Sequence, residues 1–147
     1  MFGIVLAAHG EVAPALLAAA EGIVGGLDGV RAVSLQAGGD PDQMRDELLD
    51  AIRAVDAGDG VLMLVDMFGG TPSNVCLTCG APSRLEVVTG VNLPMVVKAT
   101  TVRDSSLADA AQLITAYGQR HVAHATEILR ERRRRAGADP EGASASR

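Results

Sequence analysis

Two short, uninterrupted apolar runs constrain the fold of this chain more than any other feature. They are GIVLAA at residues 3–8 and GVLMLV at residues 60–65. Strands this apolar must be covered on both faces, which is typical of a parallel sheet packed between helices. Because segments with helical spacing separate these runs, the sequence predicts an α/β fold.

The rest of the chain alternates between strand and helix patterns. We expect strands at 3–8, 30–36, 60–66 and 84–89, and helices at 12–24, 41–57, 72–80 and 107–117. This order predicts an open, mostly parallel sheet with helices on both faces. Two segments stay ambiguous. Asn92 followed by Pro94 favours a further helix, although Val96 and Val97 fit a strand equally well, and residues 120–129 show no clear period.

Two helix starts carry capping signals. Asp40 is an expected N-cap with Gln43 closing a capping box, and Ser106 forms the same pattern with Asp109. Gly118 is expected to end the second of these helices, because glycine commonly follows the last helical residue.

Length and composition bound the number of domains and the kinds of partner. With 147 residues, we expect one domain over 1–130 and an Arg-rich, disordered C-terminal tail over 131–147. Aromatic residues make up only 2%, which excludes base stacking as the main binding mode, so no nucleic-acid partner is expected. Residues 1–129 hold 7 Lys/Arg and 15 Asp/Glu, so the body favours positively charged proteins. The Arg run at 130–135 could contact nucleic acid or anionic lipid, but a solvated terminus is the simpler interpretation.

The sequence predicts a cytoplasmic protein without membrane insertion. No apolar run approaches the roughly 20 residues that span a bilayer. The N-terminal stretch has no basic region before it and no cleavage signature, so it fits a buried strand better than a signal peptide.

A histidine and an aspartate follow two of the expected strands. His9 ends the first strand and Asp66 ends the third. If these strands are neighbours, both side chains emerge at the carboxyl edge of the sheet, where α/β proteins place their chemistry. An aspartate that accepts the proton of one ring nitrogen leaves the other nitrogen with a free lone pair, as a nucleophile or a metal ligand. A structural histidine remains the alternative at this stage.

The segment DMFGGTPSN at 66–74 strengthens the catalytic interpretation. Gly69 and Gly70 permit a sharp turn, and Thr71 with Pro72 opens a helix whose N-terminus favours anions such as phosphate. An ordinary capped turn is the alternative. Nucleotide-binding signatures, GxGxxG after the first strand or GxxxxGK[ST] anywhere, are missing, so ATP is not the expected donor.

A second constellation would suit a different class of protein. Cys76 and Cys79 together with His121 and His124 offer four zinc ligands, which would indicate a metal-binding or regulatory interaction module. The two halves lie far apart, and the cysteines fall inside an apolar helix pattern, where free cysteines behave as small hydrophobic residues.

Taken together, three motifs carry a family resemblance. AAHG at 7–10, LVDMFGGTPSN at 64–74 and TGVNLPM at 89–95 resemble the enzyme IIA component of the mannose family of the bacterial phosphoenolpyruvate-dependent sugar phosphotransferase system. The likeness covers about residues 1–130.

The resemblance implies a phosphotransferase that needs no metal or cofactor. His9 would accept a phosphoryl group from the phosphocarrier protein HPr and pass it to an enzyme IIB partner. By the same resemblance, Asp66 would hold the imidazole, Gly70 and Thr71 would line the phosphate pocket, Phe68 would lie beside the histidine, and Asn74 would assist.

The family also implies an assembly. Its members are homodimers with a four-stranded parallel core and an antiparallel edge strand exchanged between subunits, which would be residues 120–129 here. Because the chain ends soon after its Arg run, we expect the IIB partner to be a separate protein. Sugar uptake and regulation through the phosphorylation state remain open as outputs.

Overall fold

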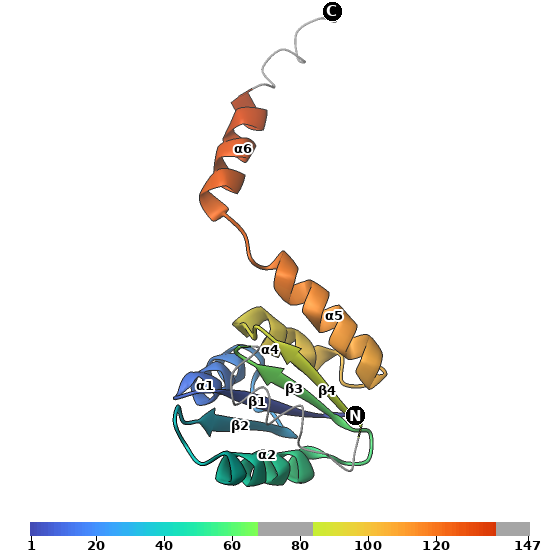
Figure 1. Cartoon of the computed structure of the whole chain (residues 1–147). Coiled ribbons are helices and arrows are strands. Elements are labelled where there is room, and N and C mark those ends of the chain that lie inside the picture. The colour runs from blue at the N-terminus through green and yellow to red at the C-terminus, as the bar shows by residue number, and fades with distance from the viewer. Residues whose placement is uncertain (68–83, 138–147) are drawn as a thin grey trace, which may run out of the picture.

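A parallel β-sheet with helices on both faces forms the body of the protein (Figure 1). The structure is a computed structural model that describes residues 1–67 and 84–137. Among these residues four strands form one sheet in the order β2-β1-β3-β4, and all three pairings are parallel. The predicted fold class and parallel core are therefore confirmed.

The strands and helices begin and end close to the predicted positions. The helix expected at 72–80 lies outside the described residues. In chain order the elements are β1 (Gly3–His9), α1 (Val12–Val24), β2 (Val30–Leu35), α2 (Pro41–Val55), β3 (Val61–Val65), β4 (Leu85–Thr89), α4 (Leu93–Thr101), α5 (Leu107–Arg120) and α6 (Ala125–Gly137).

The core has two layers, one on each face of the sheet. Alternate residues of a strand point to opposite faces. Accordingly, Ile4 and Leu6 of β1 pack with α1, α4 and α5, while Val5 and Ala7 pack with α2. All four side chains are fully buried, which explains why β1 and β3 carry no polar side chain before His9 at the end of β1.

The connections reverse direction at the centre of the sheet. The chain crosses from β1 to β2 through α1 on one face, then passes through α2 on the other face to β3, on the far side of β1. The boundary between β1 and β3 is therefore the topological switch point, where open α/β sheets bind ligands. His9 and Asp66 stand at the carboxyl ends of these two strands.

The capping predictions are confirmed for Ser106 and only in part for Asp40. The Ser106 hydroxyl accepts from the Asp109 amide at 3.2 Å and donates to its carboxylate at 2.6 Å. Asp40 caps α2 by accepting from the Asp42 amide at 3.0 Å. The capping box predicted with Gln43 is wrong, because the Gln43 amide group donates instead to Glu47, one helical turn further on.

The ambiguous segment after Asn92 forms the helix α4. The Asn92 side chain accepts from the Met95 amide at 3.0 Å and donates to the Gly118 carbonyl at 3.3 Å. This asparagine caps one helix and ties it to the next. The cap therefore outweighs the strand preference of Val96 and Val97.

Gly118 does not end α5 as predicted. The helix continues to Arg120, and a side chain at position 118 would lie 2.4 Å from the sulfur of Met95. Glycine at this position lets α4 approach α5 closely, since a larger side chain would force Met95 to move; the backbone does not turn here.

The segment expected as an exchanged edge strand is not a strand in this structure. Residues 121–124 link two helices, and α6 begins at Ala125. The helix continues through residues 131–137, where the sequence predicts a disordered tail; the rest of that tail, 138–147, lies outside the described residues. The boundary of the domain at residue 130 stays a prediction.

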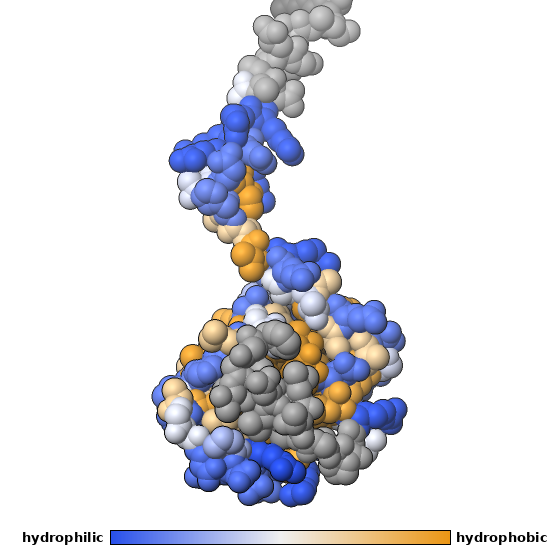
Figure 2. Space-filling view, in the orientation of Figure 1, coloured by the Kyte–Doolittle hydropathy of each residue, from blue (hydrophilic) through white to orange (hydrophobic). Residues whose placement is uncertain are grey.

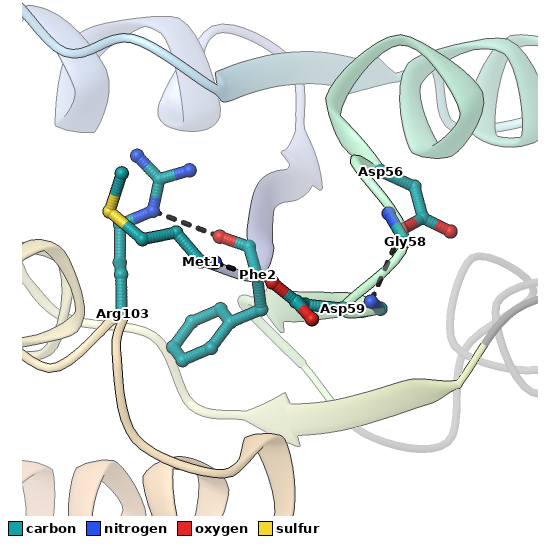
Figure 3. A network of polar contacts seen from close by, with 7 residues as sticks. Met1, Phe2, Asp56, Gly58, Asp59 and Arg103 are labelled. Carbon is teal, nitrogen blue, oxygen red and sulfur yellow. Dashed lines mark hydrogen bonds and ion pairs between the residues drawn. The ribbon is translucent and has the colours of Figure 1, made fainter.

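A polar network ties the amino-terminal edge of the sheet together (Figure 3). Arg103 donates through Nε to the Phe2 carbonyl at 2.9 Å and through Nη1 to the Asp28 carbonyl. Asp56 accepts from the Gly58 amide at 2.8 Å, and the Met1 ammonium pairs with Asp59. These contacts fasten loops at the edge opposite His9, so we interpret this network as structural.

Candidate functional site

The candidate site lies at the carboxyl edge of β1 and β3. β1 pairs with β3 up to Ala7 and Val65, so His9 and Asp66 extend from adjacent strands just beyond the last paired residues. Gly10 follows the histidine with a φ of 54°, a left-handed conformation that turns the chain from β1 toward α1. The sequence predicted both residues, and the structure brings them together.

The Asp66 carboxylate contacts both the backbone and the ring of His9. The backbone N–H of His9 donates to Oδ2 of Asp66 at 3.0 Å. Ring atom Nδ1 lies 2.9 Å from Oδ2 and 3.1 Å from Oδ1 of the same carboxylate. Because a carboxylate only accepts, Nδ1 carries the proton in this contact, and Nε2 of the neutral ring keeps its lone pair.

The ring remains accessible while the carboxylate is largely covered. The His9 side chain is 36% exposed, whereas the Asp66 side chain is 19% exposed. Partial desolvation strengthens the hydrogen bonds of the carboxylate, and the exposed part of the ring is open to a reacting group. The pair thus combines a largely covered carboxylate, which holds the ring of His9, with a ring that a reacting group can reach.

The contacts with His9 also set the ionisation of Asp66. Burial acts to raise the pKa of Asp66, but hydrogen bonds from the backbone and ring of His9, its positive charge when protonated, and the Met67 backbone together lower the pKa below its ordinary value of 3.8. Asp66 is therefore ionised at neutral pH and able to hold the Nδ1 proton.

The remaining predicted site residues cannot be placed. Phe68, Gly70, Thr71 and Asn74 lie outside the described residues, so their proximity to His9 stays a prediction. The loops described at this edge, 9–11, 36–40, 66–67 and 90–92, contain acidic residues and no Lys or Arg. Positive charge for an anionic ligand would have to come from elsewhere.

The rival zinc constellation is described only in its histidine half, because Cys76 and Cys79 lie outside the described residues. The His121 ring stacks on Tyr117 at 4.0 Å, and its Nδ1 lies 2.8 Å from the Tyr117 carbonyl. Within residues 1–67 and 84–137 no group of three or more His, Cys, Asp or Glu side chains could hold a metal ion.

The fold and the site define a class of protein. A parallel sheet with a carboxylate-held histidine at its switch point indicates an α/β protein whose chemistry lies at the carboxyl edge. The chain belongs to the family described as PTS system fructose IIA component (EIIA-man), whose model matches residues 3–116. It is accordingly a phosphotransferase component of the sugar phosphotransferase system, as the resemblance implied.

Individual relatives agree with this assignment. YadI of Escherichia coli K12 is 33% identical over 106 residues, which cover 71% of this chain and 73% of YadI. The mannose-specific EIIAB component of the same strain is 33% identical over 108 residues, or 69% of this chain. The match spans only 32% of that longer protein.

A solved structure supports both the family and the fold. The mannose/sorbose specific IIA subunit from Enterococcus faecalis superposes with a TM-score of 0.74 at 31% identity, covering 83% of this chain and 92% of that subunit. Among the helices that the structure describes, none is long and apolar enough to cross a membrane.

Proposed function

We propose that this chain is a phosphohistidine carrier that uses Nε2 of His9. The phosphoryl group would come from the phosphocarrier protein HPr and pass to an enzyme IIB partner, for sugar uptake or for regulation. The observation that carries this proposal is the contact between Nδ1 of His9 and the Asp66 carboxylate, 2.9 Å to Oδ2. It leaves Nε2 as the ring nitrogen with a free lone pair.

The transfer balances without a cofactor. The Nε2 lone pair attacks the phosphorus of the donor phosphohistidine, the new N–P bond forms, and the donor N–P bond breaks with its electrons returning to the donor ring. The proton on Nδ1 stays in place, and the Asp66 carboxylate offsets the positive charge that develops on the His9 ring. Because a phosphoramidate is exchanged for a phosphoramidate, the step is readily reversible and depends mainly on positioning.

The phosphoryl group must be stabilised close to a carboxylate. Asp66 repels the phosphoryl oxygens that it helps to orient, so donors are needed nearby. We assign this role to Gly70 and Thr71, at the N-terminus of the expected helix, with Phe68 beside the ring and Asn74 as a further donor. Replacement of Thr71 by valine should shorten the lifetime of the phosphorylated form, and an unchanged hydrolysis rate would remove Thr71 from this role.

The acidic charge of this protein favours partners that carry positive charge. The described loops at the carboxyl edge lack Lys and Arg, and the body up to residue 129 has 15 acidic against 7 basic residues. We therefore expect a donor or acceptor that docks over His9 to present positive charge that complements this acidic edge.

We also propose that the protein is a homodimer. Helix α1 exposes Val12, Ile23 and Val24 at 45%, 61% and 41%, an apolar surface suited to another protein. Sedimentation equilibrium should show a dimer that Ile23→Glu weakens. A monomer at all concentrations would contradict this part of the proposal.

The phosphorylation site can be tested because the chain has only three histidines. The protein would be incubated with labelled phosphoenolpyruvate, enzyme I and HPr, and compared with His9→Ala, His121→Ala and His124→Ala. We expect acid-labile label on the wild type and on both control variants, and none on His9→Ala. Label that persists on His9→Ala would overturn the proposal.

A further inference from the structure

Helix α6 stands apart from the rest of the molecule. None of its residues is buried, and it projects from the end of α5 beyond the four-residue link 121–124 (Figure 1). An isolated helix of 13 residues is marginal in water, because packing normally supplies most helical stability. A surface that covers one side of α6 would therefore stabilise it.

The charges of α6 differ between its two sides. On one side Glu127 pairs with Arg130 at 3.5 Å and with Arg134 at 2.9 Å. The opposite side carries apolar residues and arginines together. In helical spacing, that side presents Ala125, Ile128, Leu129, Arg132 and Ala136, with Arg133 and Arg135 at its borders.

We define Ile128, Leu129, Arg132, Arg133 and Arg135 as the mixed face of α6. Ile128 is 41% and Leu129 53% exposed, and none of the three arginine side chains has a hydrogen bond or ion pair to any described residue. Figure 2 shows hydrophobic and strongly hydrophilic surface side by side on α6. The face thus offers apolar contact and unpaired positive charge at the same place.

This combination discriminates between anionic partners. A nucleic-acid backbone would satisfy the arginines but leave Ile128 and Leu129 against phosphates, and α6 has no aromatic side chain for stacking on bases. At a lipid surface, the apolar side chains enter the acyl boundary while long arginine side chains reach back to the headgroup phosphates. We propose that the mixed face of α6 binds an anionic lipid surface.

The position of α6 gives this binding a direction. The end of α5 is held at the carboxyl edge of the sheet, because Gly118 accepts from Asn92, which follows β4. The link 121–124 and α6 therefore leave the body at the edge that carries His9. Residues 1–124, with 7 basic and 14 acidic residues, are repelled by an anionic surface, whereas α6, with 5 Arg and 2 Glu, is attracted. Binding of α6 to a membrane would therefore keep the body close to the membrane but out of contact with the lipid, with the carboxyl edge of the sheet on the side of α6.

Vesicle co-sedimentation with the full chain tests the proposal. We expect binding to vesicles of phosphatidylglycerol mixed with phosphatidylcholine, none to phosphatidylcholine alone, and weaker binding as salt is added. Circular dichroism should show more helix when the anionic vesicles are present. Binding to neutral vesicles of equal strength would overturn the role of charge.

Two double variants with the same change in net charge separate the sides of the helix. Arg132→Gln with Arg135→Gln should weaken vesicle binding about 30-fold, since each arginine near an anionic surface contributes about a factor of five. Arg130→Gln with Arg134→Gln, on the other side, should cost about threefold or less. Equal losses would show attraction by net charge alone and refute the mixed face.

The apolar half of the face has its own test. Ile128→Ala with Leu129→Ala should weaken binding to anionic vesicles, while Ile23→Ala on α1 should not. If instead the apolar variant binds vesicles normally, or if the arginines of this face bind duplex DNA more tightly than vesicles, the lipid proposal fails. It also fails if sedimentation velocity shows a dimer that the Ile128 and Leu129 changes abolish. Labelling of His9 should be unchanged in all these variants, so this result is separable from the proposed function.

Discussion

Replacement of Asp66 by asparagine tests how the site activates His9. The carboxylate accepts from the His9 backbone and from Nδ1 through contacts of 2.9 to 3.1 Å. An asparagine keeps one accepting oxygen and presents an NH₂ group in place of the other. When that group donates to Nδ1, the ring proton moves to Nε2, and the attacking lone pair is lost.

The size of the effect follows from the bond that is lost. A hydrogen bond to a charged group contributes about 1.5–3 kcal/mol, which corresponds to a rate lower by roughly 10- to 150-fold. The exposure of His9 favours the lower half of this range, because water competes for the ring. We therefore expect phosphoryl transfer from HPr to Asp66→Asn to be about 10- to 50-fold slower.

The assay is single-turnover transfer from labelled phospho-HPr, followed by rapid quenching. Asp59→Asn is a matched control, because it removes a carboxylate at the opposite edge of the sheet, and its rate should equal that of the wild type. Nitrogen NMR of His9 provides a second readout, since the wild type should protonate Nδ1 and the variant should shift toward protonated Nε2. Wild-type transfer by Asp66→Asn, or a proton on Nε2 in the wild-type protein, would refute the reasoning.

Three further predictions concern stability. Because the pKa of Asp66 is lowered on folding, its ionisation contributes stability that is present above its ordinary value of 3.8 and is lost as the pH falls through the lowered value. The unfolding free energies of the wild type and Asp66→Asn should therefore run parallel near neutral pH, and that of the wild type should fall more steeply with pH in acid. Equal slopes of the two free energies in acid would contradict the lowered pKa. Gly118→Ala should destabilise the protein by about 1–3 kcal/mol in urea, because the new methyl group meets the buried Met95 side chain. The matched change Gly22→Ala in α1, which meets nothing within 4 Å, should be neutral or stabilising. Asn92→Ala should cost about 1–2 kcal/mol through the lost cap of α4 and its bond to α5, and unchanged thermal unfolding would exclude this role.

Local signals predicted most of the fold. The apolar runs of β1 and β3 needed cover on both faces, and Ser106 and Asn92 capped helices as their side chains allow. Gly118 was misread because its role depends on the approach of Met95, a contact between two helices that no local pattern contains. Residues 120–129 carry no strong period, and the structure forms a helix there from Ala125 onward.

The site was predictable for a topological reason. His9 and Asp66 are 57 positions apart, yet each follows a buried strand, and parallel strands bring their carboxyl ends to one edge. The sequence could not predict that Asp66 also binds the His9 backbone, because that contact depends on the exact register of β1 and β3. Phe68, Gly70, Thr71 and Asn74 rest on the motif at 66–74 and remain predictions.

The contacts of Asp66 with both the backbone and the ring of His9 would have a kinetic consequence for the proposed carrier. If His9 is the phosphorylated residue, the contact of Nδ1 with Asp66 leaves Nε2 as the atom that both accepts and releases the phosphoryl group, so the donor protein and the acceptor protein would need the same approach to the ring. The two encounters exclude each other in time. Steady-state rates measured with both partners should therefore follow a ping-pong pattern. An excess of either unphosphorylated partner should lower the transfer rate, because it would block access of the other partner to Nε2 of His9.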